Sequence, residues 1–256
     1  MTTDCSEAAD AINRDGFAVV RTSFDEGRLR TLRSALEAAL VQEDSWHDTQ
    51  NRVDGAMVLV CPLYSTLFAE VLVEPTLHEL ISQLLGDTAI VYAYTSSSMP
   101  PGEGNYSVRI HNDSPHRFGV TPMNIGVTLA LTDFDTSNGA TFMMPGSHLS
   151  ALQPDPADFL ASAARFEAPA GSALVFDARL WHSGGLNTTS SWRHAITMNF
   201  CRSWMKQRLD LPRLLGEGYR NLISGEAAQR LGYLSQVPAS YMEYYQPPHR
   251  RLHRGV

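Results

Sequence analysis

The sequence predicts a mainly β fold, a double-stranded β-helix (a cupin-like jelly roll) with flanking helices. From Thr88 onward, short segments rich in β-branched and aromatic residues alternate with clusters of Pro, Gly, Asn and Ser. Several short strands separated by such turn signals favour a double-sheet jelly roll. Before Thr88 the apolar residues recur at helical spacing instead. We therefore expect helices from the first third of the chain to cover one sheet.

The helical part begins with a predicted helix over residues 6–13, which an apolar strand over 16–21 follows. Ser23 is the predicted N-cap of the next helix, because Glu26 three residues later completes a capping-box pattern. That helix carries leucines at helical spacing, namely Leu29, Leu32, Leu36 and Leu40.

A further helical region is predicted over about residues 67–85. Pro75 should break it, because proline cannot continue the hydrogen-bond ladder, and Gly86 is its expected end. The strands expected beyond it cover residues 89–94, 108–112, 124–132, 140–144, 173–176 and 194–200.

These elements predict one domain over residues 1–256. Within it, residues 1–87 form a mainly helical N-terminal part and residues 88–205 the jelly-roll core. Residues 206–256 form a C-terminal extension of helix and loop, with a helix expected over 225–231.

Composition excludes several classes of protein. The formal net charge is −7, and no long basic run precedes the last few residues, so we expect no nucleic-acid partner. The three cysteines are scattered without a disulfide pattern, the first ten residues are polar, and no apolar stretch is long enough to cross a bilayer. We expect a cytoplasmic protein with no membrane partner. The sequence leaves its oligomeric state open.

The run Arg109-Ile110-His111-Asn112-Asp113 contains the first candidate metal ligands. Residues two apart on an extended strand point to the same face, which places His111 and Asp113 together. A histidine from a remote segment would complete a set of two histidines and one carboxylate on one side of a metal. This is the ligand set of non-heme Fe(II) oxygenases. A His-x-Asp pattern is common by chance, and the alternative is a salt link at an exposed strand end.

His182 is the candidate for the third ligand. It follows an apolar strand and precedes a Gly-Gly turn, so it lies where a strand ends. The alternative is a core histidine bonded to a backbone carbonyl. Arg193, eleven residues later, could return to the same pocket on the next strand. Its guanidinium can hold a carboxylate through two hydrogen bonds. The alternative for Arg193 is a surface ion pair.

Three blocks in this order resemble the phytanoyl-CoA dioxygenase (PhyH-like) family of Fe(II)/2-oxoglutarate-dependent oxygenases. They are the segment around His111, the segment Asn138-Gly139-Ala140-Thr141 to Pro145-Gly146-Ser147-His148, and the segment from Gly171 through His182 to Arg193. The resemblance extends from Asp15-Gly16-Phe17 to about Tyr233.

The resemblance implies Fe(II), 2-oxoglutarate as co-substrate, and O2. It implies that His111, Asp113 and His182 are catalytic metal ligands and that Arg193 binds the far carboxylate of 2-oxoglutarate. In halogenating relatives a small residue replaces the carboxylate ligand, so Asp113 argues against halogenation.

Two positions depart from the family pattern. Many relatives carry a hydroxyl residue two positions after the second histidine, where this chain has Gly184 and its hydroxyl stands one place earlier, at Ser183. Many also carry a lysine where this chain has Met99. Thr95, Thr141 and Ser183 are therefore the candidates for additional contacts to 2-oxoglutarate.

Four further features have a structural alternative that we prefer or leave open. Residues 145–148 are predicted to form a turn rather than supply a fourth ligand from His148. His116 and Arg117 fit a solvated loop better than a substrate contact. Residues 100–105 could close over the site as a loop. The aromatic run 241–245 fits packing of a C-terminal helix better than a lid.

The expected function is hydroxylation of a small molecule by an Fe(II)- and 2-oxoglutarate-dependent dioxygenase in bacterial secondary metabolism. Three alternatives stay open. The same iron–oxygen chemistry could desaturate, epimerise or close a ring. A cupin-type metal isomerase or a cofactor-independent dioxygenase would use a similar fold without needing Arg193. A metal-free binding module would not need the three ligands.

Overall fold

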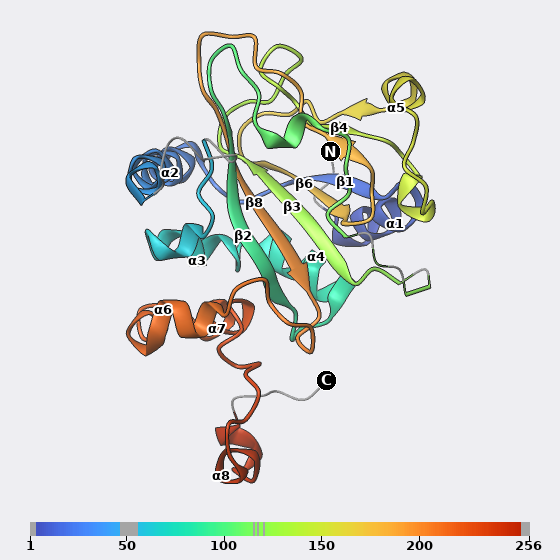
Figure 1. Ribbon diagram of the computed structural model, residues 1–256. Coiled ribbons are helices and arrows are strands. Elements are labelled where there is room, and N and C mark those ends of the chain that lie inside the picture. The colour runs from blue at the N-terminus through green and yellow to red at the C-terminus, as the bar shows by residue number, and fades with distance from the viewer. Residues whose placement is uncertain (1–3, 47–55, 115, 117, 120, 252–256) are drawn as a thin grey trace.

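The computed structural model describes residues 4–46, 56–114, 116, 118–119 and 121–251. Figure 1 shows a large twisted sheet at the centre of the molecule, with the N-terminal helices behind and beside it. The C-terminal helices extend away from the lower end of this sheet (Figure 1). Among the described residues, no helix combines the length and the apolar character needed to cross a bilayer.

The large sheet is antiparallel, with the strand order β1-β6-β3-β8-β2. Its strands are β1 (Phe17–Arg21), β2 (Ile90–Met99), β3 (Asn124–Ala130), β6 (Ser172–Asp177) and β8 (Arg193–Cys201). Every residue of β3 and β6 is buried, as expected for central strands with both faces covered.

The small sheet has the order β5-β4-β7. Its strands are short: β4 (Phe142–Met143), β5 (Ala164–Arg165) and β7 (His182–Ser183). Two antiparallel sheets of this kind are the arrangement predicted for a jelly roll. The second histidine of the candidate site begins β7, which brings it to the inside of the fold.

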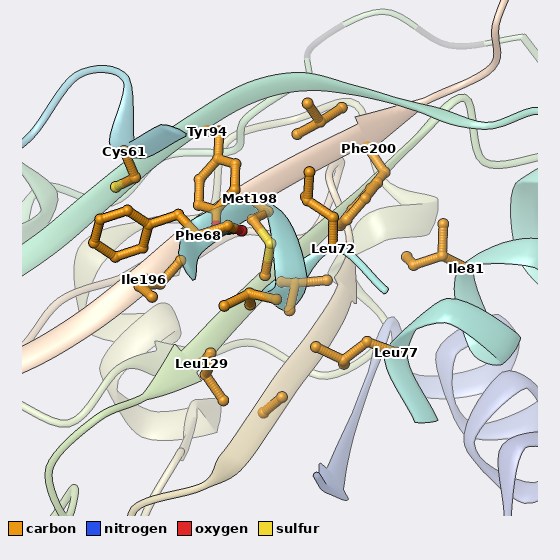
Figure 2. Packing of buried hydrophobic residues seen from close by; sticks show 14 of the residues in the cluster. Cys61, Phe68, Leu72, Leu77, Ile81, Tyr94, Leu129, Ile196, Met198 and Phe200 are labelled. Carbon is orange, nitrogen blue, oxygen red and sulfur yellow. Dashed lines mark hydrogen bonds between the residues drawn. The ribbon is translucent and has the colours of Figure 1, made fainter. Parts of the chain in front are cut away.

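Helices from the first third of the chain cover one face of the large sheet, as predicted. They are α1 (Cys5–Asp15), α2 (Glu26–Trp46), α3 (Leu67–Val71) and α4 (Pro75–Leu85). In the core, Ile196, Met198 and Phe200 of β8 face the helices and pack against the apolar side chains of α3 and α4, as Figure 2 shows. The residues between them, Thr197 and Asn199, face the opposite side, where the cleft lies.

The predicted ends of two helices can be compared with the structure. The break at Pro75 is confirmed, because Pro75 begins α4 after the Glu74 carboxylate caps the helix, and Gly86 ends α4 in a positive-φ conformation. The predicted capping box at Ser23 is wrong. The Asp25 carboxylate accepts the N–H of Arg28 at the start of α2, whereas the Ser23 N–H donates to Glu74.

Regular strand structure is absent from residues 108–112, where we expected a strand. A 3-10 turn covers Tyr106–Val108, and His111 forms an isolated bridge to His182. Several further elements have weak or no sequence signals. They are α5 (Pro156–Ser162), β5, β7 and α6 (Leu211–Arg220), which Gly216 kinks.

The C-terminal helices are α6, α7 (Gly225–Arg230) and α8 (Tyr241–Tyr244). α7 matches the helix predicted over 225–231, and its apolar residues belong to the main core. The aromatic run does not pack as we expected. Tyr241 and Tyr245 are 81% and 71% exposed, they stack on each other, and neither lines the cleft. α8 lies apart from the sheets (Figure 1).

Candidate metal centre

A pair of backbone hydrogen bonds places the two histidines side by side. The N–H of His111 donates to the carbonyl of His182 at 2.9 Å, and the N–H of His182 donates to that of His111 at 2.8 Å. The two imidazole centroids lie 4.3 Å apart. The segment around His111 therefore runs antiparallel to β7 at this point, although it is not a regular strand.

Both imidazoles are oriented in the same way by a carbonyl two residues earlier in the chain. Nδ1 of His111 lies 2.8 Å from the carbonyl oxygen of Arg109, and Nδ1 of His182 lies 2.9 Å from that of Leu180. A carbonyl only accepts, so each Nδ1 carries the proton and each Nε2 presents a lone pair. Such outer hydrogen bonds are what fixes the tautomer of metal-binding histidines.

Asp113 completes the group. Its Oδ1 lies 3.8 Å from Nε2 of His111 and 3.9 Å from Nε2 of His182. Its backbone N–H donates to the carbonyl of Ala178, which fixes the segment to the end of β6. One donor atom from each of the three residues lies within 4.8 Å of the others, which is close enough for one ion to bind all three.

The electrostatic environment of His111 favours the unprotonated imidazole that a cation needs as a ligand. Burial, and next the proximity of His182, lower the pKa of His111 to about 4. His111 is therefore neutral at pH 7, as a metal ligand must be. Two imidazoles and one carboxylate are a ligand set that fits Fe(II) in a site with open positions.

Arg193 is a buried cation in the same cleft. It is 2% exposed, and its Nη atoms donate to the carbonyls of Gly139 and Ser97 at 2.9 and 3.2 Å. Its guanidinium lies 4.4 Å from the centre of the Phe134 ring. Burial lowers its pKa to about 9, so it remains protonated at neutral pH. Among the described residues no carboxylate pairs with it, and its Nε has no hydrogen-bond partner.

A buried charge without a counter-charge is costly, unless a ligand supplies the missing anion. A carboxylate fits this position, because a guanidinium binds carboxylates with directed, charge-assisted hydrogen bonds. The residues present therefore fit both an iron ion and an acidic co-substrate.

The three candidate ligands and Arg193 line one cleft. Its empty volume is about 1090 Å³, which includes space open to solvent. Of the candidates for additional co-substrate contacts, Thr95 and Thr141 line this cleft. The hydroxyl of Thr95 is 2.6 Å from that of Thr197 on the neighbouring strand.

Ser183 and Gly184 differ from these threonines in where they point. The Ser183 hydroxyl donates to the carbonyl of Val108 at 2.7 Å and does not line the cleft. Gly184 does line it, and a Cβ at Gly184 would lie 2.5 Å from the Oγ of Ser107. The Ser107 side chain thus occupies the space that a larger residue at position 184 would need.

Phe176 supports His182 from the large sheet. Its ring centroid lies 5.0 Å from that of His182. The ring extends over Gly126 of β3, where a Cβ would come within 2.3 Å of it. Glycine at position 126 therefore leaves the space that the tip of this ring occupies.

Where the structure describes them, the remaining predicted features lie outside the cleft lining. In the turn over 145–148, the Ser147 hydroxyl accepts the N–H of Trp181, and Nε2 of His148 lies 3.2 Å from the carbonyl of Asn13. His116 is exposed, and Arg117 lies outside the described residues. The loop over 100–105 is bonded to the 187–189 segment through the backbone of Gly102 and Glu103.

Sequence reasoning missed several cleft residues. Ser97, whose carbonyl and hydroxyl accept from Arg193, had no distinguishing signal. Thr197 and Asn199 had one, because these polar residues alternate with Ile196, Met198 and Phe200 and so predict a polar face on β8. The other missed residues include Tyr92, Ser107, Phe176 and Arg208.

The two-sheet fold and the His-Asp-His group define a non-heme iron oxygenase of the jelly-roll class. The sequence profile of the phytanoyl-CoA dioxygenase (PhyH) family matches residues 12–195. The chain belongs to this family, as its motifs predicted. It is a 2-oxoglutarate-dependent non-heme iron dioxygenase, and its predicted cofactors Fe(II) and 2-oxoglutarate are confirmed.

Individual relatives cover much of the chain. The uncharacterized protein Rv1501 of Mycobacterium tuberculosis is 30% identical over 98% of this chain and 95% of its own length. The Fe(II)/2-oxoglutarate-dependent dioxygenase nvfF of Aspergillus novofumigatus is 29% identical over 53% of this chain and 47% of its own.

Solved structures confirm the predicted fold. EctD from S. alaskensis, determined with 2-oxoglutarate and 5-hydroxyectoine, aligns with a TM-score of 0.67 at 20% identity. The alignment covers 79% of this chain and 77% of EctD. The non-heme monooxygenase ThoJ aligns with a TM-score of 0.65, also at 20% identity, over 79% of this chain and 80% of ThoJ.

Proposed function

We propose that this enzyme hydroxylates an unactivated C–H bond of a small molecule in bacterial secondary metabolism. In this proposal His111, Asp113 and His182 bind the iron, and Arg193 binds the far carboxylate of 2-oxoglutarate. The observation that carries the assignment is that both histidines direct Nε2 toward the Asp113 carboxylate while Nδ1 is held by a carbonyl.

The bound Fe(II), together with 2-oxoglutarate and O2, supplies the oxidant that cleaves the C–H bond. The residues of the protein bind the iron and the co-substrate, orient them, and shield the site from water. The paired backbone hydrogen bonds of His111 and His182 hold two ligands in a fixed relation, and Phe176 limits how far the His182 ring can turn. Arg193 provides a fixed positive charge, which its bonds to Gly139 and Ser97 keep in place. Thr95 and Thr141 are the proposed additional contacts to the co-substrate, because both line the cleft.

A small-molecule substrate without several phosphates agrees with the charge of the cleft. Its described lining contains two arginines and no lysine, which is few cations for the several phosphates of a coenzyme A thioester. Desaturation, epimerisation or ring closure would use the same residues. The position of the substrate's second C–H bond or hydroxyl relative to the iron would decide between these outcomes.

The experiment compares the iron content and succinate release of the wild-type enzyme with those of three variants. We expect His111→Ala, Asp113→Ala and His182→Ala each to lose bound iron and to lower 2-oxoglutarate-dependent succinate release by at least about 100-fold. His116→Ala is the matched control, because His116 is an exposed histidine three residues after Asp113. Full iron content and succinate release in the three variants would contradict the assignment.

Arg193→Ala separates this proposal from the cupin-type alternatives. A metal isomerase or a cofactor-independent dioxygenase would keep its activity in this variant. The proposed oxygenase would lose its affinity for 2-oxoglutarate while retaining iron.

A further inference from the structure

The cleft that holds His111, Asp113, His182 and Arg193 is also lined by a second arginine, Arg208. Cross-strand pairing places Phe176, Gly126, Asn199 and Ala93 in one row across β6, β3, β8 and β2. Phe176 contacts His182 at one end of this row. Neighbouring strands are about 4.8 Å apart, so the row spans about 14 Å from Phe176 to Ala93.

A β-bulge lies at the far end of this row. The pairing of β2 with β8 shifts between Val91 and Ala93, which leaves Tyr92 without a partner in the ladder. A bulge redirects a side chain and a carbonyl that a regular strand would use elsewhere. Here Tyr92 lines the cleft, and its carbonyl accepts the backbone N–H of Arg208 at 3.0 Å.

A neighbouring side chain fixes the segment that carries Arg208. Nε2 of Gln207 donates to the carbonyl of Val91 at 2.8 Å and to that of Leu231 at 3.1 Å. The backbone before the arginine is thereby joined both to β2 and to the end of α7. Arg208 therefore reaches the cleft from a fixed backbone, although its side chain is exposed.

The charges along the cleft do not balance. Asp113, a proposed metal ligand, is the one carboxylate in the described lining, while Arg193 and Arg208 both line it. Within the described part of the chain, the Arg208 guanidinium has no hydrogen bond or ion pair. Asn199, which belongs to the row, also lines the cleft, and its Oδ1 accepts from Asn124 at 2.8 Å, which directs the Asn199 amide.

We propose that Arg208 binds an oxyanion of the substrate at the end remote from the carbon that is oxidised. The substrate class is then small organic molecules that carry a carboxylate or a phosphate ester at the end remote from the reacting C–H bond. In this proposal Arg193 binds the co-substrate, and Arg208 binds the substrate. This inference rests on the proposed function, because it takes the iron to lie between the three ligands.

The test uses binding to the full-length enzyme under anaerobic conditions, with Fe(II) and 2-oxoglutarate present. The compounds are carboxylic acids of graded length, their primary amides, and phosphate monoesters of the corresponding alcohols. We expect acids or phosphate esters to raise the melting temperature and the amides of the same skeletons to have a smaller effect. The two anionic series identify which oxyanion is bound.

Variants assign the effect to Arg208. We expect Arg208→Gln to weaken binding of the anionic compounds at least about tenfold, with Arg208→Lys intermediate. Arg213→Gln is the matched control, because Arg213 is an exposed arginine five residues later that does not line the cleft. The KM for 2-oxoglutarate in uncoupled succinate release should change less than twofold in Arg208→Gln.

Two results would overturn the inference. If the anionic compounds bind no better than their amides, the cleft has no oxyanion site. If Arg208→Gln binds the anionic compounds as tightly as the wild-type enzyme does, Arg208 is not part of such a site. Binding does not require turnover, so this test is separate from the test of the reaction. Bound acid without succinate release would count against the proposed function, whereas succinate release without selectivity for acids would count against Arg208.

Discussion

His111 and His182 each donate a backbone N–H to the other's carbonyl, at 2.9 and 2.8 Å, and their rings lie 4.3 Å apart. Two residues that are 71 positions apart in the sequence are thus held side by side by one antiparallel β-bridge. The geometry of the candidate metal site is therefore a property of the backbone ladder. We expect side-chain substitutions at the two ligands to remove the metal while leaving the fold intact.

Arg193→Lys tests the role of the buried guanidinium. Lysine keeps the charge but cannot reproduce the directed hydrogen bonds to the carbonyls of Gly139 and Ser97. We expect the KM for 2-oxoglutarate to rise about 100-fold, in line with the loss of a charge-assisted pair. The measurement is steady-state succinate release at varied 2-oxoglutarate. A KM within twofold of the wild-type value would contradict this role.

Gly126→Ala tests the contact between Phe176 and the sheet. The new Cβ would meet the Phe176 ring at 2.3 Å, and the ring cannot move without disturbing its contact with His182. We expect the free energy of unfolding to fall by about 1–3 kcal/mol and iron affinity to fall with it. Urea titration and iron titration measure the two effects.

Phe176→Leu provides the second half of this test. The smaller side chain should remove most of the clash, so the double variant should be more stable than the sum of the two single effects predicts. Strict additivity would show that the ring and position 126 do not interact.

Gly184→Ala probes the departure from the family pattern. The added methyl group would meet the Oγ of Ser107 at 2.5 Å and the flexible end of Met99 at 2.9 Å. We expect a loss of about 1–3 kcal/mol of unfolding free energy, which Ser107→Ala should largely restore in the double variant. Thermal or urea unfolding of the four proteins measures this coupling. Equal losses with and without Ser107→Ala would be inconsistent with it.

His194 predicts a dependence of stability on pH. It is 4% exposed, it lies 2.9 Å from the Ser98 hydroxyl through Nδ1, and Glu37 faces its Nε2 at 3.6 Å. Burial, followed by the charges of Arg33 and Arg193, lowers its pKa to about 4. The folded state therefore favours the neutral imidazole more than the unfolded state does.

The sign of the effect follows from the two pKa values. The pKa of His194 in the folded state is below the ordinary value of 6.5. Below pH 6.5 the unfolded chain therefore binds a proton at His194 that the folded protein does not, and this lowers the free energy of unfolding. Stability should be fully retained above pH 6.5 and decrease between about 6.5 and 4, by a total of about 3 kcal/mol. In His194→Gln this decrease should be smaller by that amount. Urea titration of the metal-free protein at several pH values measures it, and identical pH profiles would argue against this cause.

The sequence predicted the fold and the type of chemistry because both depend on local patterns. Leucines at helical spacing in α2 and apolar runs in β6 are visible in any short window of the sequence. A single His-x-Asp pattern is common by chance and does not identify a metal site. The ordered family motifs around His111, His182 and Arg193 made the prediction specific.

Long-range contacts explain what the sequence did not predict. The segment around His111 pairs with β7 only through an isolated bridge and is otherwise held by backbone bonds to Ala178, so no strand pattern describes it. Ser23 had a capping-box sequence, but Glu74 from a distant helix accepts its N–H and Asp25 caps α2 instead. Arg208 reaches the cleft through a bulge at Tyr92, and a bulge depends on the pairing of two strands rather than on either sequence.

The central claim is that His111, Asp113 and His182 bind iron with 2-oxoglutarate beside Arg193. Absorption spectroscopy of the anaerobic enzyme during titration with Fe(II) and 2-oxoglutarate tests it most directly. We predict a weak metal-to-ligand charge-transfer band in the wild-type protein and in His116→Ala, and no band in His111→Ala. Absence of the band from the wild-type enzyme, or its persistence in His111→Ala, would contradict the account.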